Sequence, residues 1–542
     1  IITTNLLNIA GTVSPGTGLN NVGTLNLTGL YTQQAGANFE ADLQPGGPPD
    51  LLLITGSAAL GGNIQLNTLA SNFGVYEQFR IIATDNPIPT IFDTATQPVT
   101  GAGLGSGFAW VGRVNDAGVF NLNNPGTGNN VDVIIALTPA ALPNLTPNQQ
   151  AVANYLSLYA VPGGVFIEDA MVYLITQIVA GGPNALDQIG GEVYDSFTTF
   201  AFDTGRQYGR LVDDRVRMLR CAAKSGAASP FCATETPTLL ADTGPDSIPT
   251  PGADSPKGFS PNTHPYGWSI WASAIGSFLS KDRTSTNLGY SGATYGGVMG
   301  VDLAITKRWI VGVMVGGSWS NIDFSGVGGD GDLSNVGVGV YTAWLGSRWF
   351  ANASFTYSKN WIEADRNLQF GTVNSVANGK TEGDQYAAHA TLGYGFSISK
   401  VALEVAGGID WVQLRQDAFT ETGAGLLNLS VRSRTDDSLR LRIGVRGAVP
   451  FQIRQGFMLT PSAKVGYARE LLDNTRPITS SLSPIPGSFT VHGDDGSRNI
   501  LTFGAGIKAD WSQGITLSVN YDGEWAGDRQ IHGVTGRIQI RW

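Results

Sequence analysis

Hydrophobic and polar residues alternate along several stretches of the second half of the chain, and the clearest stretch is residues 533–542. Val534, Gly536, Ile538, Ile540 and Trp542 occupy one side of this period-two pattern, and Thr535, Arg537, Gln539 and Arg541 occupy the other. A strand with charges on one face and aliphatic residues plus a terminal aromatic on the other fits a wall between lipid and water. We interpret this stretch as the closing strand of an outer-membrane barrel.

Two upstream strands place more charges on a single face. Leu439, Leu441, Ile443 and Val445 alternate with Arg440, Arg442, Gly444 and Arg446. Three arginines on one face cannot pack into an ordinary sandwich core, but they can line a wet lumen, as can Arg537 and Arg541. On the polar face of the preceding strand, within 401–411, lie Glu404 and Asp410. We expect these two carboxylates to be lumenal partners of the arginines.

The connections between the predicted strands alternate in length from Tyr266 onward. Short connections lie near 306–307, 346–347, 397–400, 451–456 and 512–514, and long polar ones near 281–290, 321–335, 360–384, 414–436, 469–498 and 524–533. Outer-membrane barrels alternate in this way between short periplasmic turns and long extracellular loops. Five short and six long connections predict about twelve antiparallel strands, with both ends of the barrel on the periplasmic side. An external N-terminal region would then have to pass through the lumen.

Residues 1–143 show no helical periodicity. Short apolar runs such as 51–54 and 131–137 are separated by glycine and asparagine turns. Strands of this length and spacing suit a parallel β-helix or a β-sandwich. We favour the end of a right-handed parallel β-helix, because the runs are too short for long antiparallel hairpins.

Residues 144–223 are predicted to form a short α-helical linker. Thr146 and Pro147 offer a helix cap and a first helical position, and a second helix is expected over 166–179. A further helix near 204–219 is polar around most of its circumference, so it belongs in a polar lumen or on a surface. Residues 224–264 form a Pro/Ser/Thr-rich linker, and residues 265–542 form the barrel. The sequence leaves open whether 204–222 or 224–264 fills the pore.

Composition restricts the classes of partner and membrane contact. The 542 residues carry a net charge of −10, only 14% are charged, and 72 are glycine. Since no stretch approaches the ~20 apolar residues of a membrane helix, a membrane form must be a closed barrel. The acidic balance without a basic patch argues against nucleic acid. The chain begins at Ile1 without a leader pattern, and we take it as processed or truncated.

Few residues suggest chemistry. The sequence contains neither G-x-S-x-G nor H-E-x-x-H, and the glycine pattern at 326–331 lies in a predicted flexible loop rather than at a strand-to-helix turn. We therefore expect no catalytic residue, no metal site and no cofactor. Cys221 and Cys232 are the only cysteines, and their close spacing in an oxidising compartment favours one disulfide over free thiols.

Several segments resemble the autotransporter family. Residues 11–16, 25–29, 50–56 and 61–64 resemble the end of an autotransporter passenger, and 75–92 resemble the tail of that module, with Ile91 where the family has glycine. Residues 185–194 and 206–220 resemble the helical linker, and 271–278 and 292–302 resemble the first two barrel strands. Gly536, Ile538, Ile540 and Trp542 match the family's C-terminal signal for the barrel-assembly machinery, with Trp542 where many members have phenylalanine.

The resemblance implies a type V secretion protein of a Gram-negative bacterium. Its barrel would translocate an N-terminal passenger, driven by passenger folding outside, and then anchor it at the cell surface. The implied partners are outer-membrane lipid, the barrel-assembly machinery and a surface or host ligand that the sequence does not identify. Some members cut their passenger inside the barrel with lumenal acidic and amide groups. Glu404 and Asp410 are the first candidates for such a role, and the alternative is that they only neutralise the arginines.

Two rival interpretations remain. One is a porin-like channel with a periplasmic N-terminal domain, which conductance would distinguish from a plugged translocator. The other is an anchor for a surface enzyme or adhesin whose active part lies upstream of Ile1.

Overall fold

The protein is described from a computed structural model. The structure describes residues 1–16, 21–69, 77–89, 108–115, 129–137, 139–157, 168–222, 268–306, 308–472, 475–482, 486–493, 497–511 and 515–540. The chain forms two compact units. The first contains residues 1–190, 368–375 and 481–491, and the second contains residues 191–367, 376–480 and 492–542.

Short parallel strands stack into two sheets in the first unit. One sheet contains, in order, β1 (Leu6–Asn8), β3 (Thr24–Gln33), β5 (Leu51–Ala59) and β7 (Gln78–Thr84), and the other contains β2 (Thr12–Val13), β4 (Asn38–Leu43) and β6 (Asn63–Thr68). The register pairs Thr24 with Leu51 and Asn38 with Asn63, so one coil takes 51 − 24 = 27 residues in the first sheet and 63 − 38 = 25 in the second. Successive strands therefore alternate between the two sheets, as in a parallel β-helix, and this prediction is confirmed.

The interior of the coils is apolar, with few polar groups. Tyr31, Phe39 and Leu52 are fully buried there. Burial raises the pKa of Tyr31 to about 12, and its hydroxyl donates to Gln33 Oε1 at 2.6 Å. Asp50 accepts the backbone N–H groups of Gly23 and Asp42, at 2.6 and 3.0 Å, and burial raises its pKa.

Two antiparallel strands complete the first sheet. β9 (Asn130–Leu137) pairs antiparallel with both β7 and β8 (Phe108–Asn115). Val131 and Val133 of β9 belong to the same buried cluster as the coils. The parallel ladder therefore ends in antiparallel pairing at this edge.

The predicted linker is helical. After η1 (Pro139–Ala141) come α1 (Pro147–Ser157), α2 (Glu168–Gly181) and α3 (Pro183–Gly190). The cap expected at Thr146 is present as a reciprocal pair. Gln149 N donates to Thr146 Oγ1 at 3.2 Å, and Thr146 N donates to Gln149 Oε1 at 2.8 Å.

Two segments distant in sequence pack with these helices in the first unit. The ring of Phe489 lies 5.2 Å from that of Tyr155 in α1. Leu482 N donates to the Tyr155 hydroxyl at 3.2 Å, and Gln369 N donates to Gln188 Oε1 of α3 at 2.6 Å. The helices are thus held by backbone and ring contacts with 368–375 and 481–491.

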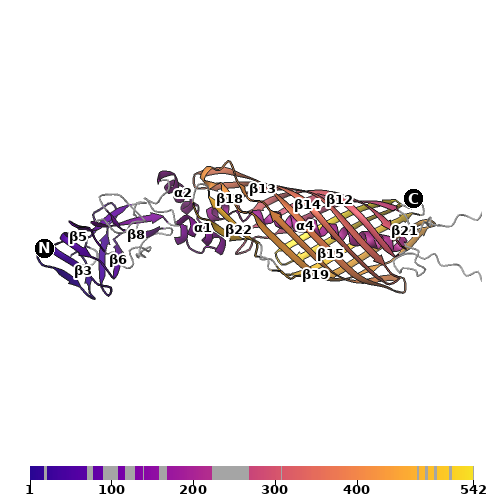
Figure 1. Cartoon of the computed structure of the whole chain (residues 1–542), viewed down its shortest axis with the longest axis horizontal. Coiled ribbons are helices and arrows are strands. Elements are labelled where there is room, and N and C mark those ends of the chain that lie inside the picture. Colours follow the sequence, from indigo (N-terminus) through magenta and orange to yellow (C-terminus); the bar gives the residue numbers. More distant parts are fainter. Residues whose placement is uncertain are drawn as a thin grey trace, which may run out of the picture. The chain divides into compact units, whose positions relative to one another are not determined.

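A sheet that closes on itself forms most of the second unit (Figure 1). Its strands are β10 (Trp268–Lys281), β11 (Gly289–Ala304), β12 (Trp309–Ser325), β13 (Gly329–Leu345), β14 (Trp349–Phe370), β15 (Val373–Ile398), β16 (Val401–Gln416), β19 (Arg434–Ala448), β21 (Phe457–Glu470), β24 (Asn499–Trp511), β25 (Ile515–Ala526) and β26 (Arg529–Ile540). The short β20 (Phe451–Arg454) pairs with β21. β10 pairs antiparallel with β26, and β19 with β21, which closes a barrel of twelve strands as predicted.

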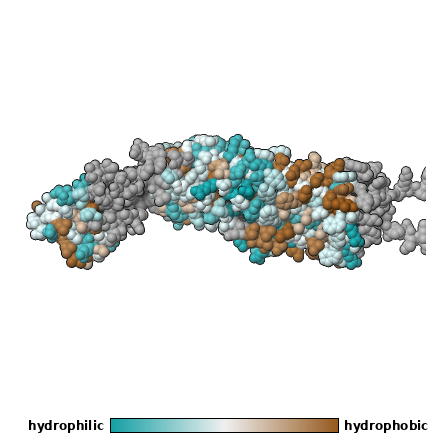
Figure 2. Space-filling view, viewed as in Figure 1, coloured by the Kyte–Doolittle hydropathy of each residue, from teal (hydrophilic) through white to brown (hydrophobic). Residues whose placement is uncertain are grey.

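Burial alternates along the barrel strands. In β12, Trp309, Val313 and Trp319 are exposed, whereas Ile310 and Met314 between them are buried. In Figure 2, hydrophobic residues gather over the right-hand part of the barrel, and hydrophilic ones cover most of its left-hand part. On β14 the outward apolar positions run over the eight steps from 349 to 357, about 27 Å along the strand. After strand tilt this fits the ~25 Å band that faces lipid.

Three of the predicted long loops are instead long hairpins with tight turns. Only residues 326–328, 371–372 and 527–528 separate β12 from β13, β14 from β15 and β25 from β26. Gly326, Gly328, Gly371 and Gly527 have positive φ in these turns, a conformation that suits glycine. The prediction of a flexible loop at 326–331 is wrong, because strand pairing continues where polar residues on both faces hide the hydrophobic alternation. Asp323 pairs with Asp330 in this extension.

Two of the remaining long connections contribute a small second sheet. Its order is β17 (Phe419–Thr420), β18 (Leu429–Val431), β22 (Pro477–Leu482) and β23 (Phe489–His492), with η2 (Gly425–Leu427) between β17 and β18. Short connections are found where predicted between β13 and β14, at 346–348, and between β15 and β16, at 399–400. The predicted turn at 512–514 lies outside the described residues.

Candidate functional site: the helix inside the barrel

The helix α4 (Tyr194–Ala222) runs inside the barrel (Figure 1). Its 29 residues give a length of about 43 Å. Asp195 lies in its first turn and Arg220 in its last, which complements the helix dipole. Of the two segments that the sequence offered as pore filler, 204–222 lies in the lumen, and 224–264 lies outside the described residues.

A buried ion pair joins α4 to β11. Arg215, which is fully buried, donates from Nε and Nη2 to the two carboxylate oxygens of Asp302, at 2.7 and 3.0 Å. The hydroxyl of Tyr341 also donates to Asp302, at 2.9 Å. Two parallel N–H···O bonds fix both distance and orientation, so this pair sets the position of α4 against the wall.

Glu404 of β16 receives two arginines from the last turns of α4. Arg217 Nε and Arg220 Nη1 lie 3.1 and 2.7 Å from its two oxygens. The guanidinium of Arg220 also lies over the ring of Phe350, 4.1 Å from the centroid. The side chain of Glu404 is 2% exposed, so removal of both arginines would leave a buried carboxylate without a counter-charge.

Asp213, in the middle of α4, belongs to a cluster of four side chains with His389, Asp410 and Arg442. Asp213 bonds His389 Nε2 and Arg442 Nη1, each at 3.1 Å. Asp410 bonds the other nitrogen of the same histidine at 2.6 Å and forms an ion pair with Arg442, whose Nε lies 3.0 Å away. Asn352 Nδ2 also donates to Asp213 at 2.9 Å. The helix is therefore linked here to β14, β15, β16 and β19.

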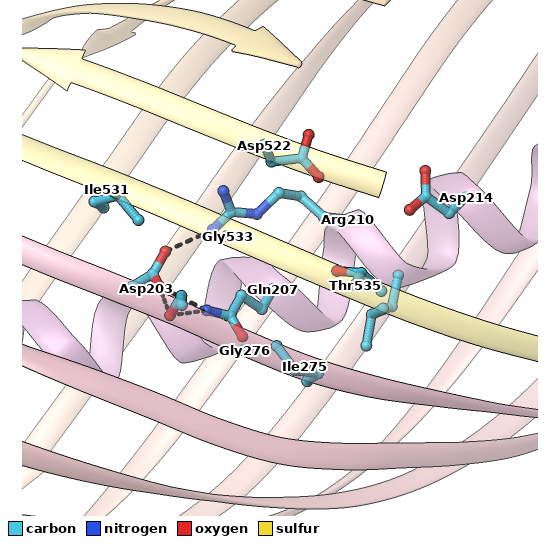
Figure 3. A pocket seen from close by; sticks show the side chains of 12 residues that line it. Asp203, Gln207, Arg210, Asp214, Ile275, Gly276, Asp522, Ile531, Gly533 and Thr535 are labelled. Carbon is cyan, nitrogen blue, oxygen red and sulfur yellow. Dashed lines mark hydrogen bonds and ion pairs between the residues drawn. The ribbon is translucent and has the colours of Figure 1, made fainter. Parts of the chain in front are cut away.

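Three residues before Asp213 in α4, Arg210 links the helix to the last strands of the barrel (Figure 3). It donates to Asp203 of the same helix at 2.6 Å and to Glu524 of β25 at 2.9 Å. Glu524 also accepts from Arg440 of β19 at 3.2 Å, and Arg440 bonds Glu470 of β21 at 3.1 Å. One connected network therefore joins α4 to β19, β21 and β25.

The first turn of α4 is fixed by charges from the surrounding loops and strands. Asp195 bonds Arg476 at 3.1 Å, and Arg434 donates to Thr198 Oγ1 at 2.7 Å. Tyr194 donates to Glu421 at 2.6 Å, and Glu421 also accepts from the buried Arg366 at 3.0 Å. Both ends of α4 are thus held by hydrogen-bonded ion pairs.

The predicted lumenal charges differ in their contacts from the pairing we expected. Asp410 bonds Arg442, but Glu404 bonds arginines of α4 instead of the wall arginines. Arg446 donates to Ser462 Oγ at 2.9 Å. Arg537 donates to the Leu211 carbonyl oxygen of α4 at 2.9 Å, and Arg541 lies outside the described residues.

The other predicted site residues have fewer described contacts. Gly536 and Ile538 lie in β26, with Ile538 44% exposed on its outer face. Only the backbone of Ile540 is described, and Trp542 lies outside the described residues, as do Cys232 and the side chain of Cys221. The role of these residues stays a prediction.

α4 lies close to one side of the barrel. A Cβ added at Gly205 would lie 2.4 Å from Gln385 Nε2, and one added at Gly209 would lie 2.4 Å from His389 Nδ1. Glycines four residues apart thus let the helix approach β15 and β16. A cavity of about 140 Å³, lined by many charged side chains, lies between α4 and parts of β16, β19, β21, β24 and β25. The lumen is filled unevenly.

Sequence reasoning missed about half of this network. The missed residues from the strands and loops are Asp302, Arg366, His389, Glu421, Arg434, Glu470, Arg476 and Glu524. Asp302 follows the same alternation as its neighbours, so the inward side of β11 could have been read from the sequence. Glu470 and Glu524 lie where we predicted loops, so strand length was the missing information.

Two negative findings concern the described part of the chain. No helix there is both long enough and apolar enough to cross a membrane. No group of three or more His, Cys, Asp and Glu side chains in the same residues is placed to hold a metal ion.

Known proteins resemble part of this chain. The esterase EstA of Pseudomonas aeruginosa is 24% identical over 260 residues, which are 47% of this chain and 40% of that protein. Outer membrane protein B of Rickettsia typhi is 23% identical over 286 residues, 51% of this chain and 17% of that protein. The extracellular serine protease of Serratia marcescens is 20% identical over 272 residues, 50% of this chain and 26% of that protein. The chain thus spans less than half the length of these curated relatives.

A solved structure and a family model also match part of the chain. The translocator domain of the autotransporter NalP from Neisseria meningitidis is 16% identical, covers 51% of this chain and 88% of that domain, and gives a TM-score of 0.42. Residues 270–522 match the model of the autotransporter β-domain. This match, over a closed barrel of twelve strands, shows that the C-terminal half of the chain is an autotransporter β-domain and that the chain is an autotransporter protein of the bacterial outer membrane.

Proposed function

We propose that the barrel carries the upstream part of this chain across the outer membrane and then anchors it at the cell surface. The observation that supports this most strongly is α4. It follows the helices of the first unit along the chain, and its charges pair with charges around the lumen at several heights, from Asp195 to Arg220. A helix bonded in this way fits the segment that stays in the lumen after transport. Passage driven by folding of the β-helix outside needs no nucleotide in the outer membrane.

Surface proteolysis of intact cells tests this proposal. A protease added to the medium should release fragments of residues 1–143 while the barrel of 265–542 stays in the membrane, with 144–223 and 224–264 as the linker between them. Lysed cells provide the matched control, because a periplasmic N-terminal domain would be cut only after lysis. Protection of residues 1–143 in intact cells would favour the porin-like alternative.

Conductance in a planar bilayer separates the same alternatives independently. With α4 in place, small cavities of about 30, 50 and 140 Å³ lie between the described parts of the helix and the wall. We expect small currents from the whole chain. A large, steady current would contradict the proposal that α4 remains in the lumen.

We propose that the inward-facing charges act as a clamp on α4 and have no catalytic role. Glu404 and Asp410 are each engaged by cations, Glu404 by Arg217 and Arg220 and Asp410 by Arg442 and His389. Neither carboxylate is therefore available as an unpaired base. Replacement of either by its amide should leave the apparent mass of the chain in outer membranes unchanged. A changed apparent mass, caused by altered cleavage of the chain, would contradict this proposal.

The C-terminal signal and the disulfide remain proposals as well. Gly536, Ile538, Ile540 and Trp542 would be recognised by the barrel-assembly machinery, and deletion of Trp542 should lower the amount of folded barrel in the membrane. Cys221 and Cys232 would form one disulfide, and thiol labelling with and without reductant tests it.

For the described chain we propose translocation and anchoring instead of enzymatic activity. EstA is named an esterase and the Serratia protein a serine protease, and each extends well beyond the region matched here. Assays of the purified chain with a nitrophenyl ester and with casein should show no turnover. Turnover abolished by a substitution within residues 1–143 would contradict this proposal.

A further inference from the structure

An apolar trough of about 600 Å³ lies on the outer face of the barrel, over β11 to β14. Its floor consists of valines in neighbouring strands, since the register places Val313 opposite Val340 and Val315 opposite Val338. Met299 of β11 borders it on one side, and Phe355 and Tyr357 of β14 border it on the other. The four valines are between 44% and 58% exposed, so no other part of the described chain covers them.

Beside the residues that line the trough, two glycines face outward. Gly297 and Gly317 are opposite each other in β11 and β12. A Cβ added at Gly297 would have only one ordinary contact, with Ser273 O at 3.5 Å, so packing does not require a glycine there. In β25, by contrast, a Cβ at Gly523 would lie 2.4 Å from the Phe503 ring. An aromatic ring fills the gap there, whereas the depression at Gly297 is open.

The trough lies within the lipid-facing band. Trp309 lies beyond one end of it, and the stacked rings of Tyr295 and Trp319, 6.4 Å apart, lie beyond the other. Such aromatic residues mark the two interfaces of a membrane. Lys359 occurs in the same cross-strand row as Gly317 and Val336. The glycine end of the trough is therefore at headgroup level, on the side of the long hairpins.

We propose that this trough binds one acyl chain of a lipid from the leaflet at the long-hairpin end of the barrel. The wall of a second barrel is too broad to enter a trough formed between side chains of neighbouring strands, whereas a single flexible hydrocarbon chain can lie along it. The β-branched valines of the floor hold nearly fixed rotamers, so the shape is formed before the lipid arrives. An acyl chain that lies against them exchanges slowly compared with the lipid around the rest of the barrel.

Native mass spectrometry of the full chain, extracted from outer membranes in mild detergent, tests the proposal. The wild-type protein should retain one acyl-bearing lipid. Filling the trough with Val313→Trp and Val340→Trp should lower its occupancy at least tenfold. The matched control is Val445→Trp with Val465→Trp, because these residues also form an outward-facing cross-strand pair. The control should retain the lipid.

A second pair of variants keeps the test decisive if bulky tryptophans impair folding. Gly297→Leu should lower lipid occupancy, whereas Gly407→Leu, whose added Cβ would meet only Arg442 O at 3.6 Å, should not. Heat-modifiable migration on gels checks folding of each variant. Equal retention in trough and control variants, or a wild-type protein without retained lipid, would overturn the proposal. So would a wild-type dimer that the trough variants fail to form, since that result would identify a second copy as the occupant.

Discussion

Replacement of Asp302 by asparagine should loosen α4 by a calculable amount. The change keeps the shape of the side chain but leaves the guanidinium of Arg215, which is 0% exposed, without a counter-charge. Removal of one partner of a buried ion pair costs roughly 3–5 kcal/mol. Since every 1.4 kcal/mol is about a factor of ten, hydrogen exchange of the backbone amides in the second half of α4 should accelerate by roughly two to three and a half orders of magnitude.

Two further variants separate the unpaired charge from a general loss of packing. Arg215→Met combined with Asp302→Asn removes both charges and should regain most of the lost protection, because no buried ion then lacks a partner. Arg217→Met is the matched control. Arg217 is 20% exposed and Glu404 keeps Arg220, so exchange should accelerate at most about tenfold. Exchange in Asp302→Asn within threefold of the wild type would refute the reasoning.

Three other changes test separate parts of the fold. Gly209→Leu places side-chain atoms where His389 lies, 2.4 Å from the added Cβ. It should destabilise α4 in its position inside the barrel by about 1–3 kcal/mol. Unchanged hydrogen exchange of the α4 amides would contradict the close approach of α4 to β15. Thr146→Ala removes one half of the capping pair with Gln149 and should lower the stability of α1 by about 1 kcal/mol; equal exchange rates in α1 would show that the cap is dispensable. Burial raises the pKa of Asp50 above 3.8, so the folded state binds this proton more tightly than the unfolded state, and its contribution to stability falls as pH rises from about 3.8 through the raised value. Asp50→Asn should remove that part of the pH dependence of β-helix unfolding, and an unchanged slope would count against it.

The barrel was predictable because its physics is local and repeats. In β19 a side chain at every second position must face either lipid or water, so the sequence alone indicates which side Arg440 and Arg442 occupy. The capping pair at Thr146 is equally local. In the β13 extension the same rule gives no signal, because Asp330 and Asp332 point towards solvent and the hydrophobic alternation disappears. Backbone pairing continues there, and only the partner strand reveals it.

The partners of the inward charges depend on which element enters the lumen, and no single strand carries that information. The two cations that pair with Glu404 are far from it in sequence. Arg217 and Arg220 come from a helix, 187 and 184 positions upstream. The wall alone offers Arg446 as the cross-strand neighbour of Glu404, which is the pairing that alternation favours. A buried carboxylate is stabilised more by two guanidinium groups, one on each oxygen, than by a single cation beside a cavity. Glu404 therefore pairs with the arginines of α4, whereas Arg446 donates to Ser462 and lines the cavity. The partners of Glu404 therefore follow only from the presence of α4 in the lumen, because the wall sequence alone predicts a different pair.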